Sequence, residues 1–391
     1  MSFQRVIKNT THLLISRAVR LWASVALRIW DPGKARMTDT APKRILLINC
    51  AHIGDVVIST SLLPVLRSAY PQAEFGFLTG SWSLMVVKDH PEVAFTHQID
   101  HWRLNRATIP LLKKLLRSWT TRRRALREIR NLNYDMSLSL HTWFPDFIGL
   151  AWRAHIPTRL GFRHSWFAPF ATMLATFPTA DFIPQGVRVA EILSPLQLDP
   201  SHLSKRHSML APSSEGAKQE VCHLLGVEAL EKASYIVIHI GSGEPGRELP
   251  VEFWRYVAQA LSARYTLLFT GRGSREEQQI AQVIHGLAHC VSACNQLSWN
   301  GFVTAVRYAE VLYGVESMAG HVAAAVGTPC TVVYSGTAGV ARWRPDGSNV
   351  TVFTQHVPCA PCGLPGGCEH MTCLRGVRPE SILHVERGFS K

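Results

Sequence analysis

The sequence predicts an α/β fold made of two doubly wound, Rossmann-like domains. Apolar runs of strand length alternate with helical segments in two successive blocks, the first beginning at Arg44 and the second at Tyr235. The runs are continuously apolar, which is typical of parallel strands covered by helices on both faces. A chain of 391 residues is long enough for two such domains, and ligands of such proteins usually bind in the cleft between domains.

The first block, residues 44–200, is expected to be the N-terminal domain. Its strands are predicted at 44–49, 75–79, 96–99, 135–140 and 159–162. Helices are predicted at 55–69, 106–130 and 147–153. Residues 201–232 are polar and irregular, and we interpret them as a linker.

The second block, residues 233–391, is expected to be the C-terminal domain. Its strands are predicted at 235–240, 265–270, 311–315 and 330–334, and its helices at 251–263, 275–285, 299–309 and 320–326. Strand and helix alternate throughout, so the same parallel architecture is predicted twice.

The composition is that of a globular protein with an anionic partner. Hydrophobic residues make up 47% and charged residues 18% of the chain, while the formal net charge is +13 and the pI about 9.6. Such a balance favours a membrane surface, a phosphorylated substrate or nucleic acid. Nucleic acid is the weakest of the three, because the basic residues lack interleaved aromatic side chains for base stacking.

Residues 1–43 differ from the rest and are predicted to hold a basic amphipathic helix. Arg17, Arg20, Ser24 and Arg28 fall on one helical stripe beside aliphatic and tryptophan side chains. Such a helix lies on a membrane surface or packs on the enzyme or on a partner subunit. A third alternative is that translation starts at Met37. Because no apolar run approaches the roughly 18 residues of a bilayer span, and arginines interrupt any signal peptide, we expect a cytoplasmic protein.

The first motif is the loop 49–56 after the first strand, which contains Gly54 and Asp55. Gly54 is expected to allow the turn. Asp55 follows the carboxyl end of a strand, where a carboxylate is placed to accept a proton. Alternatively it caps the next helix, since aspartate is a favoured N-cap residue.

The second motif, 241–246, matches G-x-G-x-x-G and includes Ser242 and Gly243. A dinucleotide site is not favoured, because Pro245 and Pro250 delay the next helix to about Val251 and no acidic residue ends the following strand. A nicotinamide-dependent oxidoreductase therefore stays an alternative only. The loop still suits a phosphate, which Arg247 could bind in bidentate fashion; otherwise Arg247 is a surface arginine.

The third motif, 315–329, is a strand end, a polar loop and a helix of small residues. Backbone N–H groups at such a helix start bind phosphate, and Ser317 and His321 add further donors. Alternatively, Glu316 and Ser317 only cap the helix and His321 is a core histidine.

In this order the three motifs resemble glycosyltransferase family 9, the ADP-heptose:lipopolysaccharide heptosyltransferases, over about 44–383. The resemblance implies a GT-B type fold, with two facing Rossmann-like domains, the acceptor on the first and the nucleotide sugar on the second. It further implies inverting transfer of heptose from ADP-heptose to an anionic glycolipid, the lipopolysaccharide inner core, without a catalytic cofactor or metal. The enzyme would be peripheral on the cytoplasmic face of the inner membrane.

By position, the resemblance makes Asp55 the catalytic base and assigns donor binding to the residues of the second and third motifs. Arg247 stands where the family usually has a lysine that contacts the donor phosphates. The donor-binding signature matches Glu316, Ser317, Gly320 and His321, while Gly54, Ser242 and Gly243 are the candidate loop and phosphate positions.

The chain departs from the family pattern at several positions. Glu316 replaces the usual aspartate, Met318 the usual glycine, and Ala51 and His52 replace small hydroxyl residues. These differences leave open another sugar, an acceptor that is another glycan or a protein, or a non-catalytic nucleotide-sugar-binding homologue. The basic helix at 106–130 suits an anionic acceptor, or is a solvated helix face.

Four of the nine cysteines cluster near the C-terminus, at Cys359, Cys362, Cys368 and Cys373. Four thiolates could hold a structural zinc or iron ion, which would leave no open position for catalysis. Free thiols are the alternative. The other five cysteines are scattered among apolar segments and are interpreted as small core residues.

Overall fold

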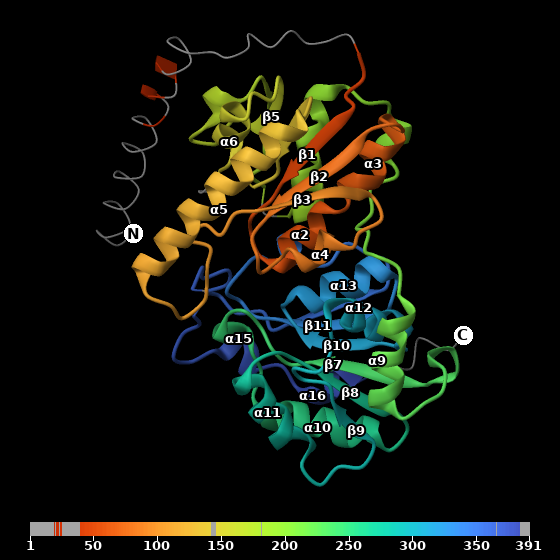
Figure 1. Ribbon diagram of the computed structural model, residues 1–391. Helices are drawn as coiled ribbons and strands as arrows, with labels where there is room; N and C mark the ends of the chain where they lie inside the picture. The colour runs from red at the N-terminus through yellow and green to blue at the C-terminus, as the bar shows by residue number, and fades with distance from the viewer. Residues whose placement is uncertain are drawn as a thin grey trace. The chain divides into compact units, whose positions relative to one another are not determined.

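The computed structural model describes residues 19, 21–22, 24–25, 40–141, 146–180, 182–364 and 366–383 (Figure 1). They fall into two compact units. Unit 1 comprises the chain up to Thr179 with Gly186–Arg206, and unit 2 comprises Ala180–Gln185 with the chain from His207. Both units are α/β, and each contains one six-stranded sheet.

The sheet of unit 1 has the order β3-β2-β1-β4-β5-β6, and all its neighbouring strands pair in parallel. The strands are β1 (Arg44–Ile48), β2 (Glu74–Thr79), β3 (Val93–Gln98), β4 (Met136–Ser139), β5 (Thr158–Phe162) and β6 (Met173–Ala175). The strand order reverses between β1 and β4, so the loops after these two strands leave a topological switch point, where ligands of such sheets bind.

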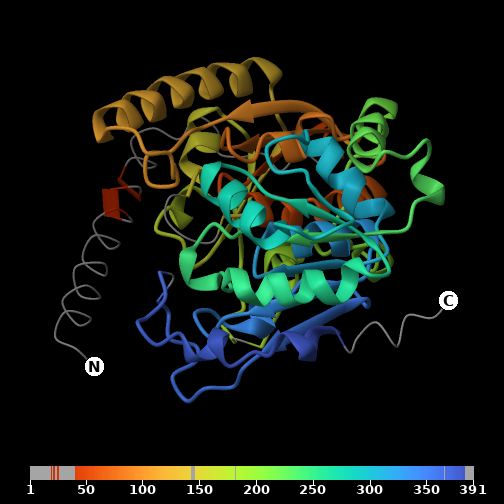
Figure 2. The ribbon, with the colours of Figure 1, turned by 90° about the horizontal axis from the view of Figure 1, so that it is seen from below.

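Helices and short 3-10 turns (η) connect the strands of unit 1. They are α2 (Ile53–Ser59), α3 (Leu62–Ala69), α4 (Met85–Lys88), α5 (Leu111–Leu132), α6 (Ile148–Arg153), η1 (Ala168–Phe170), α7 (Gln185–Ala190), η2 (Glu191–Leu196) and α8 (Pro200–Leu203). The long α5 packs beside β3, and Figures 1 and 2 show its N-terminal end extending past the strands. It begins after Pro110 and ends at Asn133 in a left-handed conformation.

Unit 2 repeats this architecture with the sheet order β12-β11-β10-β7-β8-β9, again parallel throughout. The strands are β7 (Tyr235–His239), β8 (Thr266–Thr270), β9 (Cys290–Ser292), β10 (Leu312–Val315), β11 (Cys330–Tyr334) and β12 (Val350–Thr354). Every residue of β7, β10 and β11 is buried, as expected for central strands covered on both faces. Here the order reverses between β7 and β10.

The helices and 3-10 turns of unit 2 begin and end with standard signals. They are α9 (Glu215–Leu225), η3 (Leu230–Lys232), η4 (Pro245–Arg247), α10 (Val251–Ser262), α11 (Ser274–Ile284), α12 (Trp299–Tyr308), α13 (Met318–Val326), α14 (Val340–Trp343), α15 (Thr372–Arg375) and α16 (Pro379–Leu383). The hydroxyls of Ser214, Ser298 and Ser317 cap α9, α12 and α13, and Gly226 and Gly327 end α9 and α13 with positive φ.

The α/β fold class predicted from the sequence is confirmed, while several details differ. The segment 201–232 contains α9 as well as loops, because Ser214 and Gly226 provide both ends of a helix. Helix α5 begins at Leu111 and not near 106, since Pro110 holds the preceding backbone extended. Arg17, Arg20 and Arg28 lie outside the described residues. Within the described ranges, none of the helices combines the length and the apolar run of a bilayer span.

Candidate active site

The residues of the second and third motifs lie at the switch point of unit 2. Strands β7 and β10 are parallel neighbours, so their carboxyl ends meet at one edge of the sheet. The loop after β7 carries Ser242 and Arg247, and the loop after β10 carries Glu316 and Ser317. Although about 70 residues separate the two motifs in sequence, the parallel sheet thus brings them together.

Arg247 and Glu316 form the central contact of this cluster. Arg247 Nη1 lies 3.4 Å from Glu316 Oε1, with the Glu316 side chain almost fully buried and the Arg247 side chain partly exposed. Two further buried atoms, Arg247 Nε and Glu316 Oε2, have no hydrogen-bond partner among the described residues. Buried polar atoms are nearly always satisfied, so these two atoms are suited to bind the polar groups of a ligand.

Burial raises the pKa of Glu316 to about 7, and the nearby Arg247 opposes this rise. The carboxyl group therefore changes its charge near neutral pH. Below this pH it is neutral and leaves the Arg247 guanidinium without a paired anion, and above it the ion pair forms. The site thus presents a cation whose neutralisation depends on pH.

Two serines connect the loops and start the next helix. Ser242 Oγ donates a hydrogen bond of 3.1 Å to the backbone oxygen of Glu316, which ties the loop after β7 to the loop after β10. Ser317 is the N-cap residue of α13, and its hydroxyl accepts a bond of 3.4 Å from Ala319 N. Capping was one interpretation of Ser317, and it leaves the other N–H groups of this helix start, with the positive end of its dipole, at the same edge.

Gly320 and His321 belong to the first turn of α13, which begins at Met318 and not at Gly320. A Cβ on Gly320 would lie 3.1 Å from Val332 Cγ2 and 3.1 Å from Pro345 Cγ, so a glycine here lets α13 approach β11 closely. Burial lowers the pKa of His321 to about 4, against the effect of Asp346. His321 is therefore neutral at pH 7, and offers one donor and one acceptor. Gly243 lies exposed in the loop after β7.

In unit 1 the first motif forms a braced loop at the carboxyl end of β1. Asn49 Oδ1 accepts a 3.0 Å bond from Ala51 N, and Asn49 Nδ2 donates to Ser59 Oγ at 2.7 Å. Ala51 O accepts from Trp82 Nε1 at 2.7 Å. These bonds fix the backbone directly before Asp55, which lies partly exposed in the first turn of α2.

The structure corrects two expectations about this loop. Gly54 lies inside α2, which begins at Ile53, so it belongs to the helix and not to the turn. Asp55 is not the N-cap residue, because that position is taken by His52, whose side chain makes no capping bond. Asp55 is the third helical residue, where a carboxylate interacts favourably with the helix dipole.

The G-x-G-x-x-G motif does not form a dinucleotide site. The helix after β7 is α10, which begins at Val251 as expected from the two prolines. In addition, the Glu276 carboxyl packs directly against Gly241, where a Cβ would overlap it. The space at the first glycine is therefore filled by a side chain, and the helix begins well after the loop, unlike in dinucleotide folds.

Comparison with protein families decides the relationship. The model of glycosyltransferase family 9 (heptosyltransferase) matches residues 122–365, more than half of the chain. The chain belongs to glycosyltransferase family 9. No curated protein matches it significantly.

Solved structures of family 9 and of heptosyltransferases share the fold. The family 9 glycosyl transferase of Veillonella parvula is 19% identical with a TM-score of 0.71, over 88% of this chain and 96% of that one. E. coli ADP-heptose lps heptosyltransferase II is 18% identical with a TM-score of 0.69, over 88% of this chain and 100% of that one. E. coli heptosyltransferase WaaC with ADP is 15% identical with a TM-score of 0.65, over 88% of this chain and 99% of that one. The GT-B type predicted from the sequence is therefore confirmed for this family 9 chain.

The predicted metal site on the four cysteines is not confirmed in this family 9 chain. Cys359 and Cys368 are exposed, whereas Cys373 is buried on α15 in the core of unit 2. Cys368 Sγ accepts a 3.3 Å bond from Met371 N. Among the described residues, no three His, Cys, Asp or Glu side chains gather where they could hold a metal ion. In this arrangement the four thiols do not form one donor set, because Cys373 is buried on α15 whereas Cys359 and Cys368 are exposed.

Two residues that brace these loops, one in each unit, were not identified from the sequence. Asn49 braces the loop before Asp55, and Glu248 Oε1 accepts a 3.3 Å bond from Ser242 N while Glu248 pairs with Arg275. A polar residue directly after a buried strand was the available signal for Asn49. For Glu248 there was none, because its partners depend on the loop conformation.

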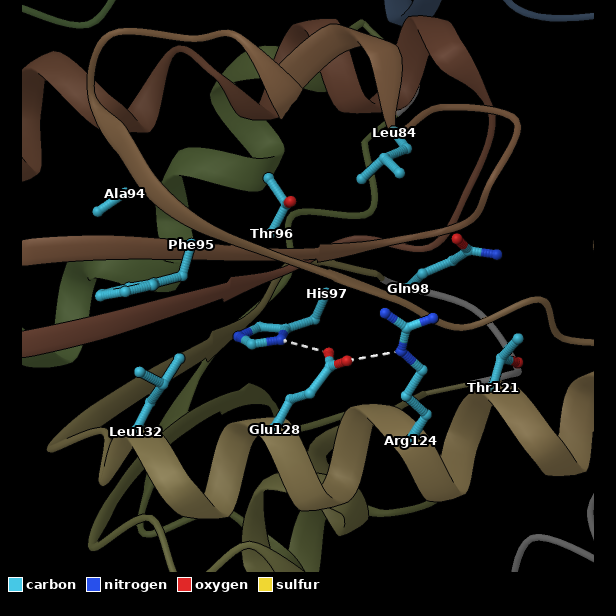
Figure 3. A pocket seen from close by; sticks show the side chains of 10 residues that line it. All are labelled: Leu84, Ala94, Phe95, Thr96, His97, Gln98, Thr121, Arg124, Glu128 and Leu132. Carbon is cyan, nitrogen blue, oxygen red and sulfur yellow. Dashed lines mark hydrogen bonds and ion pairs between the residues drawn. The ribbon is translucent and has the colours of Figure 1, made fainter.

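A cavity of about 510 Å³ lies between β3 and α5 of unit 1 (Figure 3). In it, Glu128 joins His97 at 3.1 Å and Arg124 at 2.7 Å. His97 Nε2 bonds the Tyr134 hydroxyl at 2.9 Å. Burial lowers the pKa of His97, although Glu128 opposes this effect. These contacts fasten the C-terminal half of α5 to the edge of the sheet.

Proposed function

We propose that this family 9 chain is an inverting, metal-independent heptosyltransferase that uses ADP-heptose. The observation that carries this proposal is the Arg247–Glu316 pair at the switch point of unit 2, with its two buried atoms that lack protein partners. Similar structures support the donor, since WaaC of E. coli was solved with ADP and with ADP-2-deoxy-2-fluoro heptose.

In the proposed reaction, Asp55 removes the proton of the acceptor hydroxyl as its oxygen attacks the anomeric carbon of the heptose. The bond from that carbon to the diphosphate breaks, and ADP leaves with inversion. Arg247, Ser317 and the N–H groups at the start of α13 stabilise the developing charge on the diphosphate. His321, neutral at pH 7, donates a hydrogen bond, and Ser242 and Gly243 hold the loop beside the phosphates.

We propose the lipopolysaccharide inner core as acceptor, reached from the cytoplasmic face of the inner membrane. Its phosphates are complementary to the net charge of +13. Glu316, one methylene longer than the aspartate that is usual in the family, is the position at which a different sugar would be accommodated.

The test measures ADP release from ADP-heptose with heptose-deficient lipopolysaccharide core as acceptor. Replacement of Asp55 by asparagine, which keeps the size but not the basicity, should lower kcat about 10²–10⁴-fold, whereas Asp89→Asn at an exposed carboxylate should not. A chelator should leave the rate unchanged. Full activity of Asp55→Asn would refute the base, and wild-type enzyme that binds ADP-heptose but releases no ADP would refute this acceptor. Absence of donor binding would favour a non-catalytic homologue or another nucleotide sugar.

A further inference from the structure

The N-terminal half of α5 exposes a row of large apolar side chains. Leu112, Leu115, Leu116 and Trp119 are 77%, 42%, 59% and 53% exposed. Their spacing of i, i+3, i+4 and i+7 puts them on one face of the helix. We call these four residues the α5 apolar face. Contiguous apolar surface on a folded domain marks an interaction site, whereas single exposed residues do not.

The opposite side of α5 fixes this face outward within unit 1. Lys114 Nζ donates to Asn105 O at 2.9 Å, and Arg117 Nε pairs at 2.5 Å with Asp100, which is fully buried. Thr121 Oγ1 accepts a 3.1 Å bond from Asp100 N. Since these contacts hold the helix by its polar side, the apolar face cannot turn inward without breaking them.

The charges around the face select the partner. The sequence from His101 to Arg127 contains no Asp or Glu. It contains nine cationic side chains, at Arg103, Arg106, Lys113, Lys114, Arg117, Arg122, Arg123, Arg124 and Arg127. Three of them, Lys114, Arg117 and Arg124, are engaged in the contacts within unit 1 described above. Arg123 continues the row of the apolar face, and its guanidinium lies 4.2 Å from the Trp119 ring centroid.

We propose that the α5 apolar face inserts into the surface of an anionic phospholipid bilayer. Leucine and tryptophan side chains enter the boundary between headgroups and acyl chains, while cationic side chains near the face, such as Arg123 and Arg127, pair with lipid phosphates. Trp102, also partly exposed just before the helix, is of the type enriched at this depth. The inference deepens the proposed function, because it names the surface of unit 1 that holds the enzyme at the membrane of its acceptor.

The experiment measures co-sedimentation of the full chain with vesicles, without nucleotide sugar or acceptor glycan, so the result does not depend on the proposed reaction. Vesicles of phosphatidylglycerol and phosphatidylethanolamine should bind the protein, and vesicles of phosphatidylcholine should bind it at least about tenfold more weakly. The double variant Leu112→Ser/Leu116→Ser should reduce binding to the anionic vesicles about tenfold. The control Phe182→Ser/Leu203→Ser, at two exposed apolar residues elsewhere, should not.

A second variant, Arg123→Gln/Arg127→Gln, should reduce binding to the anionic vesicles and weaken its dependence on salt, without relying on the leucines. Equal binding by the leucine variant and the wild type would overturn the proposal. It would also be overturned if sedimentation velocity showed lipid-free wild type as a dimer and the leucine variant as a monomer, because a second copy of the chain would then cover the face.

Discussion

The buried carboxyl group of Glu316 and the guanidinium of Arg247 face each other at 3.4 Å across the carboxyl ends of β7 and β10. The ion pair does not use all the hydrogen-bonding atoms of the two side chains, since Glu316 Oε2 and Arg247 Nε have no hydrogen-bond partner among the described residues. A buried ion pair of this kind contributes little stability by itself. Its arrangement is better explained by ligand binding, and the pKa of Glu316 near 7 makes that binding testable by pH.

We expect the KM for ADP-heptose to rise as the pH increases through about 7. Below this pH Glu316 is neutral, so the Arg247 guanidinium can pair with the donor diphosphate. Above it the Glu316 carboxylate neutralises Arg247 and repels the diphosphate. The negative charge of the Glu316 carboxylate should weaken donor binding by about 1 kcal/mol, which is about fivefold in KM. Steady-state kinetics at values from about pH 6 to about pH 8.5, which lie on either side of the pKa of Glu316, measure this change in KM.

Glu316→Gln imitates the protonated form, so its KM should stay low across the same range. Glu316→Asp retains an ionisable group and should retain a dependence on pH. A glutamine variant whose KM still rises near pH 7 would assign the titration to another group.

Nucleotide binding by unit 2 can be tested without an acceptor. ADP at about a hundredfold excess over its Kd should stabilise the wild type by about 2.7 kcal/mol, measured as a rise in Tm. Arg247→Met should lose most of this rise because the diphosphate loses its cation. The matched variant Arg264→Met, at an exposed arginine on the loop before β8, should keep it. Equal shifts in both variants would show that Arg247 does not contact the diphosphate.

The central strands of both sheets could be predicted from the sequence, whereas the edge strands β6, β9 and β12 and most side-chain contacts could not. Continuous apolar runs such as Tyr235–His239 identify central strands, and Pro250 correctly sets the start of α10. Contacts such as His97 with Glu128 join residues 31 positions apart, and no local pattern encodes them. The cysteines show the same limit: their spacing suggested a metal site, but spacing does not reveal that Cys373 packs into the core.

The close contact between Gly76 and Tyr134 gives a prediction about stability. A Cβ on Gly76 of β2 would overlap the Tyr134 hydroxyl and lie 2.6 Å from its Cζ atom. This ring is buried and bonded to His97, so it cannot move aside. Gly76→Ala should therefore lower the free energy of unfolding by about 1–3 kcal/mol in urea titrations. Gly149→Ala meets only ordinary contacts of 3.5 Å and serves as the control. Adding Tyr134→Phe to Gly76→Ala removes the overlapping oxygen, so a double variant with no recovery at all would contradict this explanation.

Buried histidine makes the fold sensitive to mild acid. His239 is buried beside Thr270, with Nδ1 3.0 Å from Thr270 Oγ1, and burial lowers its pKa to about 4. At pH 7 the folded and unfolded states both hold it neutral, so it has no effect on stability there. As the pH falls below about 6.5, only the unfolded state gains the proton, and stability is lost until about pH 4, where the folded state is protonated too. Between pH 7.5 and pH 5 this amounts to about 2 kcal/mol.

Urea titrations at these two pH values test the effect. His239→Gln, which keeps a polar group beside Thr270 but cannot be protonated, should lose about 2 kcal/mol less than the wild type when the pH falls from 7.5 to 5. His223→Gln, at an exposed histidine on α9, should lose as much as the wild type. Taking the difference between variants is necessary because the raised pKa of Glu316 acts in the opposite direction, costing stability as the pH rises from about 4.5 to about 7. An unchanged loss in His239→Gln would mean that His239 is already protonated in the folded protein at pH 5.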